Sequence, residues 1–146
     1  MGSGCSSWRI WQFKKTKFFN VNIINNTFYN VSAAIAVYKN AKGINISQNS
    51  ISKVGQTAIY VDALAQSDFG RFYGEKNEEI LIEKNNIKDV GHAAQGAGIV
   101  FKGVGQNAII RTNWIADVGE KIDGKNFSAF GIYVGAGVDL VGPTNV

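Results

Sequence analysis

One eleven-residue template recurs four times in this chain and constrains its fold more than any other feature. The template reads apolar-x-apolar-x-x-Asn-x-apolar-x-x-Val. Recurrence of a fixed pattern indicates one structural unit stacked on copies of itself. The copies are Val21–Val31, Ile44–Val54, Ile80–Val90 and Ala108–Val118.

A second short motif, small-Ile-x-apolar, follows each template and begins at Ala34, Ala58, Gly98 and Gly131. Alternation of apolar residues places them on one face of a strand and the intervening residues on the other. Each repeat therefore predicts three short strands, and the turn signals of tight hairpins are absent at most junctions. We expect an all-β fold of about four coils, in which three short parallel sheets enclose a filled interior.

An asparagine recurs between the second and third predicted strands of each coil. Asparagine tolerates the left-handed backbone conformation and can bond its own backbone, which suits a short turn. Asparagine side chains stacked in register can also bond one another, as they do in cross-β stacks. We therefore predict a structural asparagine ladder made of Asn26, Asn49, Asn85 and Asn113.

The motifs Ile-x-Ile-x-x-Asn-x-Ile and Gly-Ile-x-Val resemble the right-handed parallel β-helix repeats of pectate-lyase-like proteins, over roughly residues 20 to 135. The resemblance implies a right-handed parallel β-helix and favours an extracellular or cell-surface location. The resemblance does not indicate a particular activity, because lyases, glycoside hydrolases, epimerases, phage tailspikes and non-catalytic proteins share these motifs. In the lyases and hydrolases, the sugar site lies over the sheet formed by the small-Ile-x-apolar strands.

The charge distribution narrows the classes of partner. The first 20 residues hold four of the 15 basic residues and no acid, which leaves 11 basic and 11 acidic residues in the rest of the chain. A neutral repeat region argues against a nucleic-acid groove, which needs clustered basic side chains. No run of 18 apolar residues indicates a transmembrane segment, and the first residues show no apolar region of a secretory signal.

A single cysteine, Cys5, excludes an internal disulfide and a multi-cysteine metal site. We predict no metal and no cofactor. Residues Met1–Ser6 match an acylation pattern, with a short Gly/Ser start as the alternative interpretation.

We divide the chain into residues 1–19, a basic and aromatic leader or partial first coil, and residues 20–146, the β-helix repeats. Trp11-x-Phe13 is spaced as a strand of an earlier coil, and Gly137 to Val146 as the start of a fifth. Open ends of a β-helix expose apolar residues and backbone edges. We therefore expect a fragment of a longer β-helix, or self-association end to end or as a trimer.

Three insertions flank the same predicted strand, the small-Ile-x-apolar strand. They span Asp62–Glu79, Gly91–Ala97 and Gly119–Phe130. Insertions on one face of a repeat protein often mark its binding face. Drift in tolerant loops is the alternative explanation, because lengthening a loop costs little free energy.

The outward positions of this strand and the adjoining loops supply candidate substrate-binding residues. Tyrosine rings there can stack on sugars, and charged side chains can converge from strand and loops. The candidates are Tyr38, Tyr60, Asp62, Arg71, His92, Lys102, Asp123 and Tyr133.

Catalysis on a sugar needs paired carboxylates for hydrolysis, or a base with a neutralising cation for elimination. Asp62 is the only acid on the strand itself near these positions, so we assign no catalytic residue. We predict a carbohydrate-directed module that binds polysaccharide, with lyase- or hydrolase-type processing left open. The alternative is a non-catalytic structural or assembly segment of a β-helix protein.

Overall fold

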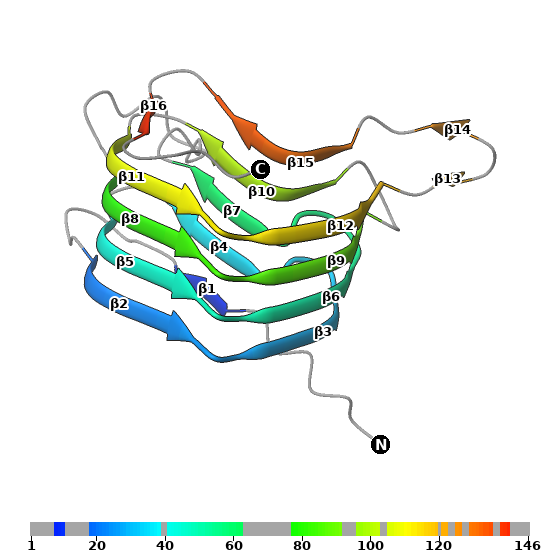
Figure 1. Cartoon of the computed structure of the whole chain (residues 1–146), viewed down its shortest axis with the longest axis horizontal. Coiled ribbons are helices and arrows are strands. Elements are labelled where there is room, and N and C mark those ends of the chain that lie inside the picture. The colour runs from blue at the N-terminus through cyan, green and yellow to red at the C-terminus, as the bar shows by residue number, and fades with distance from the viewer. Residues whose placement is uncertain are drawn as a thin grey trace, which may run out of the picture.

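The computed structural model describes residues 8–10, 18–38, 41–62, 77–91, 96–102, 105–119, 121–122, 125–126, 129–135 and 138–140. These residues form sixteen β-strands and no helix, and fourteen of the strands lie in three parallel sheets. Figure 1 shows the coils stacked from β2 and β3 at one end to β11, β12 and β15 at the other. The fold is a parallel β-helix, as the repeats predict.

Sheet A contains the small-Ile-x-apolar strands. Its members are β1 (Trp8–Ile10), β4 (Ile35–Tyr38), β7 (Ile59–Asp62), β10 (Ala97–Lys102) and β15 (Phe130–Val134). Sheet B contains the apolar-x-apolar strands. Its members are β2 (Phe18–Ile24), β5 (Ala41–Ser47), β8 (Asn77–Glu83), β11 (Gly105–Arg111) and β16 (Val138–Leu140).

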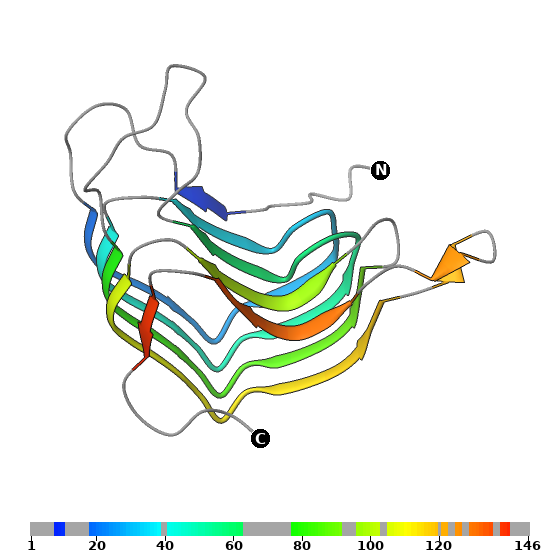
Figure 2. The same ribbon diagram turned by 90° about the horizontal axis from the view of Figure 1, so that it is seen from above.

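Sheet C follows sheet B after a sharp bend in each coil, which Figure 2 shows from above. Its members are β3 (Thr27–Val31), β6 (Ser50–Val54), β9 (Asn86–Val90) and β12 (Trp114–Val118). The template copies stack in register, with Phe28 beside Ile51, Ile51 beside Ile87, and Ile87 beside Ile115. Stacking like on like buries the apolar set of every coil against its neighbours, and this column forms part of the core.

The predicted asparagine ladder is present, and three of its four members, Asn49, Asn85 and Asn113, are buried. Asn49 donates from Nδ2 to Oδ1 of Asn85 over 2.9 Å, and Asn85 donates in the same way to Asn113 over 2.9 Å. Asn26 makes the corresponding bond to Asn49 over 3.3 Å. The backbone N–H of each lower asparagine also donates to the Oδ1 above it, over 3.0 Å. The ladder therefore ties the bends between sheets B and C together along the stack.

Left-handed backbone occurs at three places in every coil, and in two coils also at the glycine after the template valine, Gly91 and Gly119. None of these places is the ladder asparagine. The residue before each ladder asparagine has φ between 53° and 57°, as at Gln48 and Thr112. The asparagine itself must direct its N–H along the stack toward the next Oδ1. The bend therefore falls on the preceding residue, which corrects our expectation that the ladder asparagines take the left-handed conformation.

Two parts of the described structure differ from the sequence-based expectations. Trp8–Ile10 forms the strand that pairs with β4 in sheet A, whereas the predicted strand at Trp11-x-Phe13 lies outside the described residues. The third insertion contains an antiparallel pair, β13 (Lys121–Ile122) and β14 (Lys125–Asn126), which the repeat pattern does not predict. Among the described residues, no helix is long and apolar enough to cross a membrane.

Candidate functional site on the outer face of sheet A

Two columns of side chains run across the outer face of sheet A. Backbone pairing aligns Ala36 with Tyr60 and then Val100 in one column. It aligns Tyr38 with Asp62 and then Lys102 in the other. These residues alternate with core residues such as Ile59 and Val61, which are fully buried. Sheet A thus gathers tyrosine, acid and lysine side chains from three successive coils.

Tyr60, Asp62 and Lys102 form a compact group, called here the Asp62 cluster. The Tyr60 hydroxyl donates to Oδ2 of Asp62 over 2.6 Å. The Lys102 ammonium lies 3.2 Å from the same oxygen and 5.1 Å from the centroid of the Tyr60 ring. Asp62 is only 3% exposed, so its charge is held by these contacts in place of water.

The cluster shifts the ionisation of two of its members. Burial, and then the hydrogen bond to Asp62, raise the pKa of Tyr60 above its ordinary value of 10.0, although Lys102 opposes this in part. Contact with Tyr60 is the largest cause that raises the pKa of Lys102 above 10.5, with the charge of Asp62 acting in the same direction and burial against it. Both shifts keep Tyr60 neutral and Lys102 charged at neutral pH.

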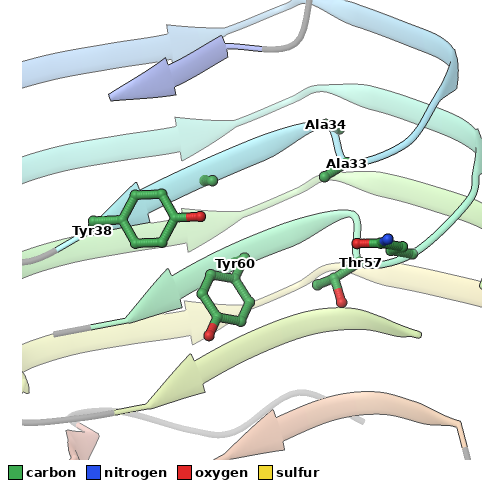
Figure 3. Close-up of a pocket in the computed structure, with 7 residues that line it drawn as sticks. Ala33, Ala34, Tyr38, Thr57 and Tyr60 are labelled. Atoms are coloured by element: carbon green, nitrogen blue, oxygen red, sulfur yellow. The ribbon is translucent and has the colours of Figure 1, made fainter. Parts of the chain in front are cut away.

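A shallow cavity of about 230 Å³ adjoins this cluster. The Tyr38 and Tyr60 rings border it, with centroids 6.0 Å apart and planes tilted by 57°. Figure 3 shows the two rings projecting from successive strands, with Ala33, Ala34 and Thr57 at the other end of the cavity. Ala36 and Gln56 complete the lining.

The cavity exists because one column changes from a small to a large residue between neighbouring coils. Ala36 lies beside Tyr60 in the register of β4 and β7. Its methyl group leaves open the space that an aromatic ring fills one coil further on. Ala36 is nevertheless buried, at 6% exposure, and its strand lies between β1 and β7, where Arg9 and Tyr60 are its register neighbours. We call this space the Ala36 hollow.

The structure brings together four of the predicted site residues: Tyr38, Tyr60, Asp62 and Lys102. Tyr133 is on the same face but at the last strand of the sheet, where its ring packs against Phe130 with centroids 5.6 Å apart. The three loop candidates, Arg71, His92 and Asp123, lie outside the described residues.

Sequence reasoning placed Ala36 on the outward face but did not include it among the site residues, and it missed the lining residues Ala33, Ala34, Gln56 and Thr57. Most of them precede the small-Ile-x-apolar motif, in the corner where the chain passes from sheet C to sheet A. A comparison of residue size down each outward column would have revealed the hollow. Such a comparison shows that alanine at position 36 faces tyrosine at position 60.

The described site is chemically suited to holding a ligand. Asp62 is the only acid in the two outward columns, and it is already engaged by Tyr60 and Lys102. Within the part of the chain that the structure describes, no group of three or more His, Cys, Asp or Glu side chains is placed to hold a metal ion. The accessible groups of the site are the aromatic rings, neutral polar groups and the Lys102 side chain, which is 39% exposed.

Comparison of the chain with protein-family models, with curated proteins and with solved structures found no match.

Proposed function

We propose that this protein is a carbohydrate-directed module that binds polysaccharide on the outer face of sheet A. The observation that carries the proposal is the pair of tyrosine rings, Tyr38 and Tyr60, bordering a cavity with neutral polar groups at its far end. Pockets of this kind combine aromatic contact area with a few polar groups that fix orientation. The resemblance to pectate-lyase-like repeats supports the same assignment, and with it a secreted or cell-surface setting.

We propose that the site binds a polysaccharide, because the described residues support binding better than cleavage. Hydrolysis of a glycosidic bond needs a pair of carboxyl groups that reach the substrate. Asp62 is buried and accepts a hydrogen bond from Tyr60 while it pairs with Lys102. Its contacts suit a role in fixing the Tyr60 ring.

The experiment is a screen of polysaccharides for binding, with release of reducing ends and of unsaturated products measured in parallel. We expect binding by the wild-type protein and by Tyr29→Ala, and weaker binding by Tyr38→Ala and Tyr60→Ala. Tyr29 is a matched control, because it is an exposed tyrosine on sheet C. Absence of binding to a broad glycan panel, or equal loss in the Tyr29 control, would contradict the proposal. Product release would assign processing as well.

A second candidate function, a structural or assembly segment, has its own supporting observation. Among the described residues, every exposed large hydrophobic side chain lies on one of four outermost strands of sheets A to C, namely β2, β3, β12 and β15. They are Phe19, Ile24, Tyr29, Trp114, Phe130, Tyr133 and Val134. Such residues at the ends of a stack favour contact with a further coil or another chain. Light scattering over a range of concentrations tests this, and a stable monomer in dilute solution counts against it.

A further inference from the structure

The two kinds of contact that the Ala36 hollow offers lie at opposite ends of it along the strand direction. Tyr38 is the last residue of β4, and the Tyr60 ring is tilted against it with centroids 6.0 Å apart. Gln56 and Thr57 line the corner where the chain enters β7. Figure 3 shows the two rings toward one end and Thr57 toward the other. A ligand that touches both the rings and the neutral polar groups must therefore extend along the strands.

The hollow is long in the strand direction and narrow across it. Its lining residues come from two neighbouring coils, and they fall between positions 33 and 38 on one coil and between 56 and 60 on the other. The strand β4 spans roughly 10 Å, at about 3.3 Å for each residue step, whereas neighbouring strands are about 4.8 Å apart. An extended ligand thus fits lengthwise along β4 and β7 and covers one pair of coils.

The Asp62 cluster closes the hollow on the side of β10. The Lys102 ammonium reaches from β10 to lie 5.1 Å from the centroid of the Tyr60 ring, and it pairs with Asp62 at 3.2 Å. Beyond this group, the column that holds Ala36 and Tyr60 continues with Val100, whose side chain has no hydrogen-bonding group. A chain laid along the stack of coils would have to cross the Tyr60 ring and Lys102 before it met Val100.

We propose that a glycan lies in the Ala36 hollow with its chain direction along β4 and β7, across the stack of coils, with Ala36 and Thr57 as binding residues. This inference rests on the proposed carbohydrate binding and adds the direction of the bound chain. Sugar C–H faces pack against the tyrosine rings, and the Thr57 hydroxyl and Gln56 amide bond sugar hydroxyls at the other end. The small Ala36 side chain leaves the path between the two ends open.

The test adds a tyrosine on either side of Tyr60 in one outward column of sheet A. Ala36→Tyr places the new ring in β4, within the hollow, and Val100→Tyr places it in β10, on the other side of Tyr60. The two variants are matched in the residue that they introduce, and they obstruct different paths. The probes are gluco-, manno-, xylo- and galacturono-oligosaccharides of one length, measured by titration calorimetry.

We expect the wild-type protein to bind at least one of these probes. Ala36→Tyr should weaken that binding about tenfold or more, and Val100→Tyr should change it by less than about threefold. An equal effect of the two substitutions would overturn the inference and leave the proposed function standing, as would undiminished binding by Ala36→Tyr. Absence of binding by the wild-type protein to every probe would overturn both.

A second pair of variants tests the polar end of the hollow. Thr57→Val keeps the shape of the side chain and removes its hydroxyl, so the affinity should fall about threefold or more through loss of one hydrogen bond. Thr27→Val makes the same change at an exposed position of β3 on sheet C and should bind as the wild type does. Equal affinities of these two variants would overturn the inference.

Circular dichroism and thermal melting show whether the variants are folded. If either tyrosine variant does not fold, Ala36→Val and Val100→Leu add less volume at the same two positions. Ala36→Val is then expected to weaken binding and Val100→Leu to leave it unchanged. Retention of full affinity by a folded Ala36→Val protein would overturn the inference.

Discussion

The hydroxyl of Tyr60 donates a 2.6 Å hydrogen bond to Oδ2 of Asp62, two residues further along β7. Residues two apart in a strand share a face, so the bond stays on the outside of sheet A. Lys102 reaches the same oxygen from β10. A buried charge on one coil is thereby linked to a tyrosine on its own coil and to a lysine on the next.

The first prediction concerns the pH dependence of this bond. Because the pKa of Tyr60 is raised in the folded protein, its contribution to stability is fully present below pH 10 and is lost as the pH rises through the raised value. We expect Tyr60 to titrate above its ordinary range in a tyrosinate absorbance difference between wild type and Tyr60→Phe. In an Asp62→Asn background, the pKa of Tyr60 should fall, because the hydrogen bond to the Asp62 carboxylate and its charge both raise it. Titration of Tyr60 at its ordinary value would contradict this.

The second prediction concerns the asparagine ladder. The Asn49 side chain donates to Ile23 O over 2.8 Å and to Asn85, and it accepts from Asn26. Asn49→Ala leaves these buried groups short of partners, at a cost of roughly 1–3 kcal/mol in the free energy of unfolding. The control Asn86→Ala changes an exposed residue one position beyond the ladder, and its cost should be well under about 1 kcal/mol.

Thermal and denaturant melts of the two variants check this expectation. Equal damage from both substitutions would show that the inward and outward positions are assigned in the wrong register.

The third prediction uses two glycines at the same position of successive repeats. A Cβ on Gly98 would lie 2.6 Å from Cγ2 of Ile115 and 2.7 Å from Gly131 O, whereas a Cβ on Gly131 would meet nothing within 4 Å. Gly98→Ala should therefore destabilise the fold by about 1–3 kcal/mol through overpacking. Gly131→Ala should be neutral or stabilising, because alanine restricts the unfolded chain more than glycine does. Denaturant unfolding of the Gly98→Ala and Gly131→Ala variants tests this prediction. Comparable stabilities of the two variants would contradict the close approach of Ile115 and Gly131 to Gly98.

The fourth prediction concerns Thr112, which has φ of 53° in the bend before Asn113. Left-handed backbone costs an ordinary residue about 1–2 kcal/mol, and asparagine tolerates it better than a β-branched residue does. Thr112→Asn should therefore raise the melting temperature. Thr27→Asn makes the same chemical change at an exposed strand position, where asparagine is disfavoured. A melting temperature for Thr112→Asn no higher than that of Thr27→Asn would argue against strain at this bend.

The fold could be predicted from the sequence because each repeat contains the residues that determine its strands and its bend. Alternating apolar residues give the strands, and the position of Asn49 and its equivalents gives the bend between sheets B and C. The stacking of like on like then follows, since only that register buries every apolar column. The left-handed conformation was expected at the ladder asparagine and occurs at the residue before it, as at Gln48 before Asn49. The sequence of one repeat does not show this, because the ladder N–H must point toward an asparagine of the neighbouring coil.

The candidate site was predictable only in part. The repeat register placed Tyr38, Tyr60, Asp62 and Lys102 on one face from the sequence, because outward positions follow from alternation. Their pairing, with Asp62 shared between Tyr60 and Lys102, depends on side-chain directions and on distances between strands far apart in the sequence.

The sequence alone thus determined the parallel coils, the buried columns and the asparagine ladder, since these follow from a local pattern repeated along the chain. Only the tertiary structure decided that Asp62 is buried and engaged, and that Ala36 leaves a hollow beside Tyr60. The physical reason is that burial and cavities depend on the relative sizes of residues on neighbouring coils. Such residues are far apart in the sequence, as are Ala36 and Tyr60, which are 24 positions apart and lie side by side.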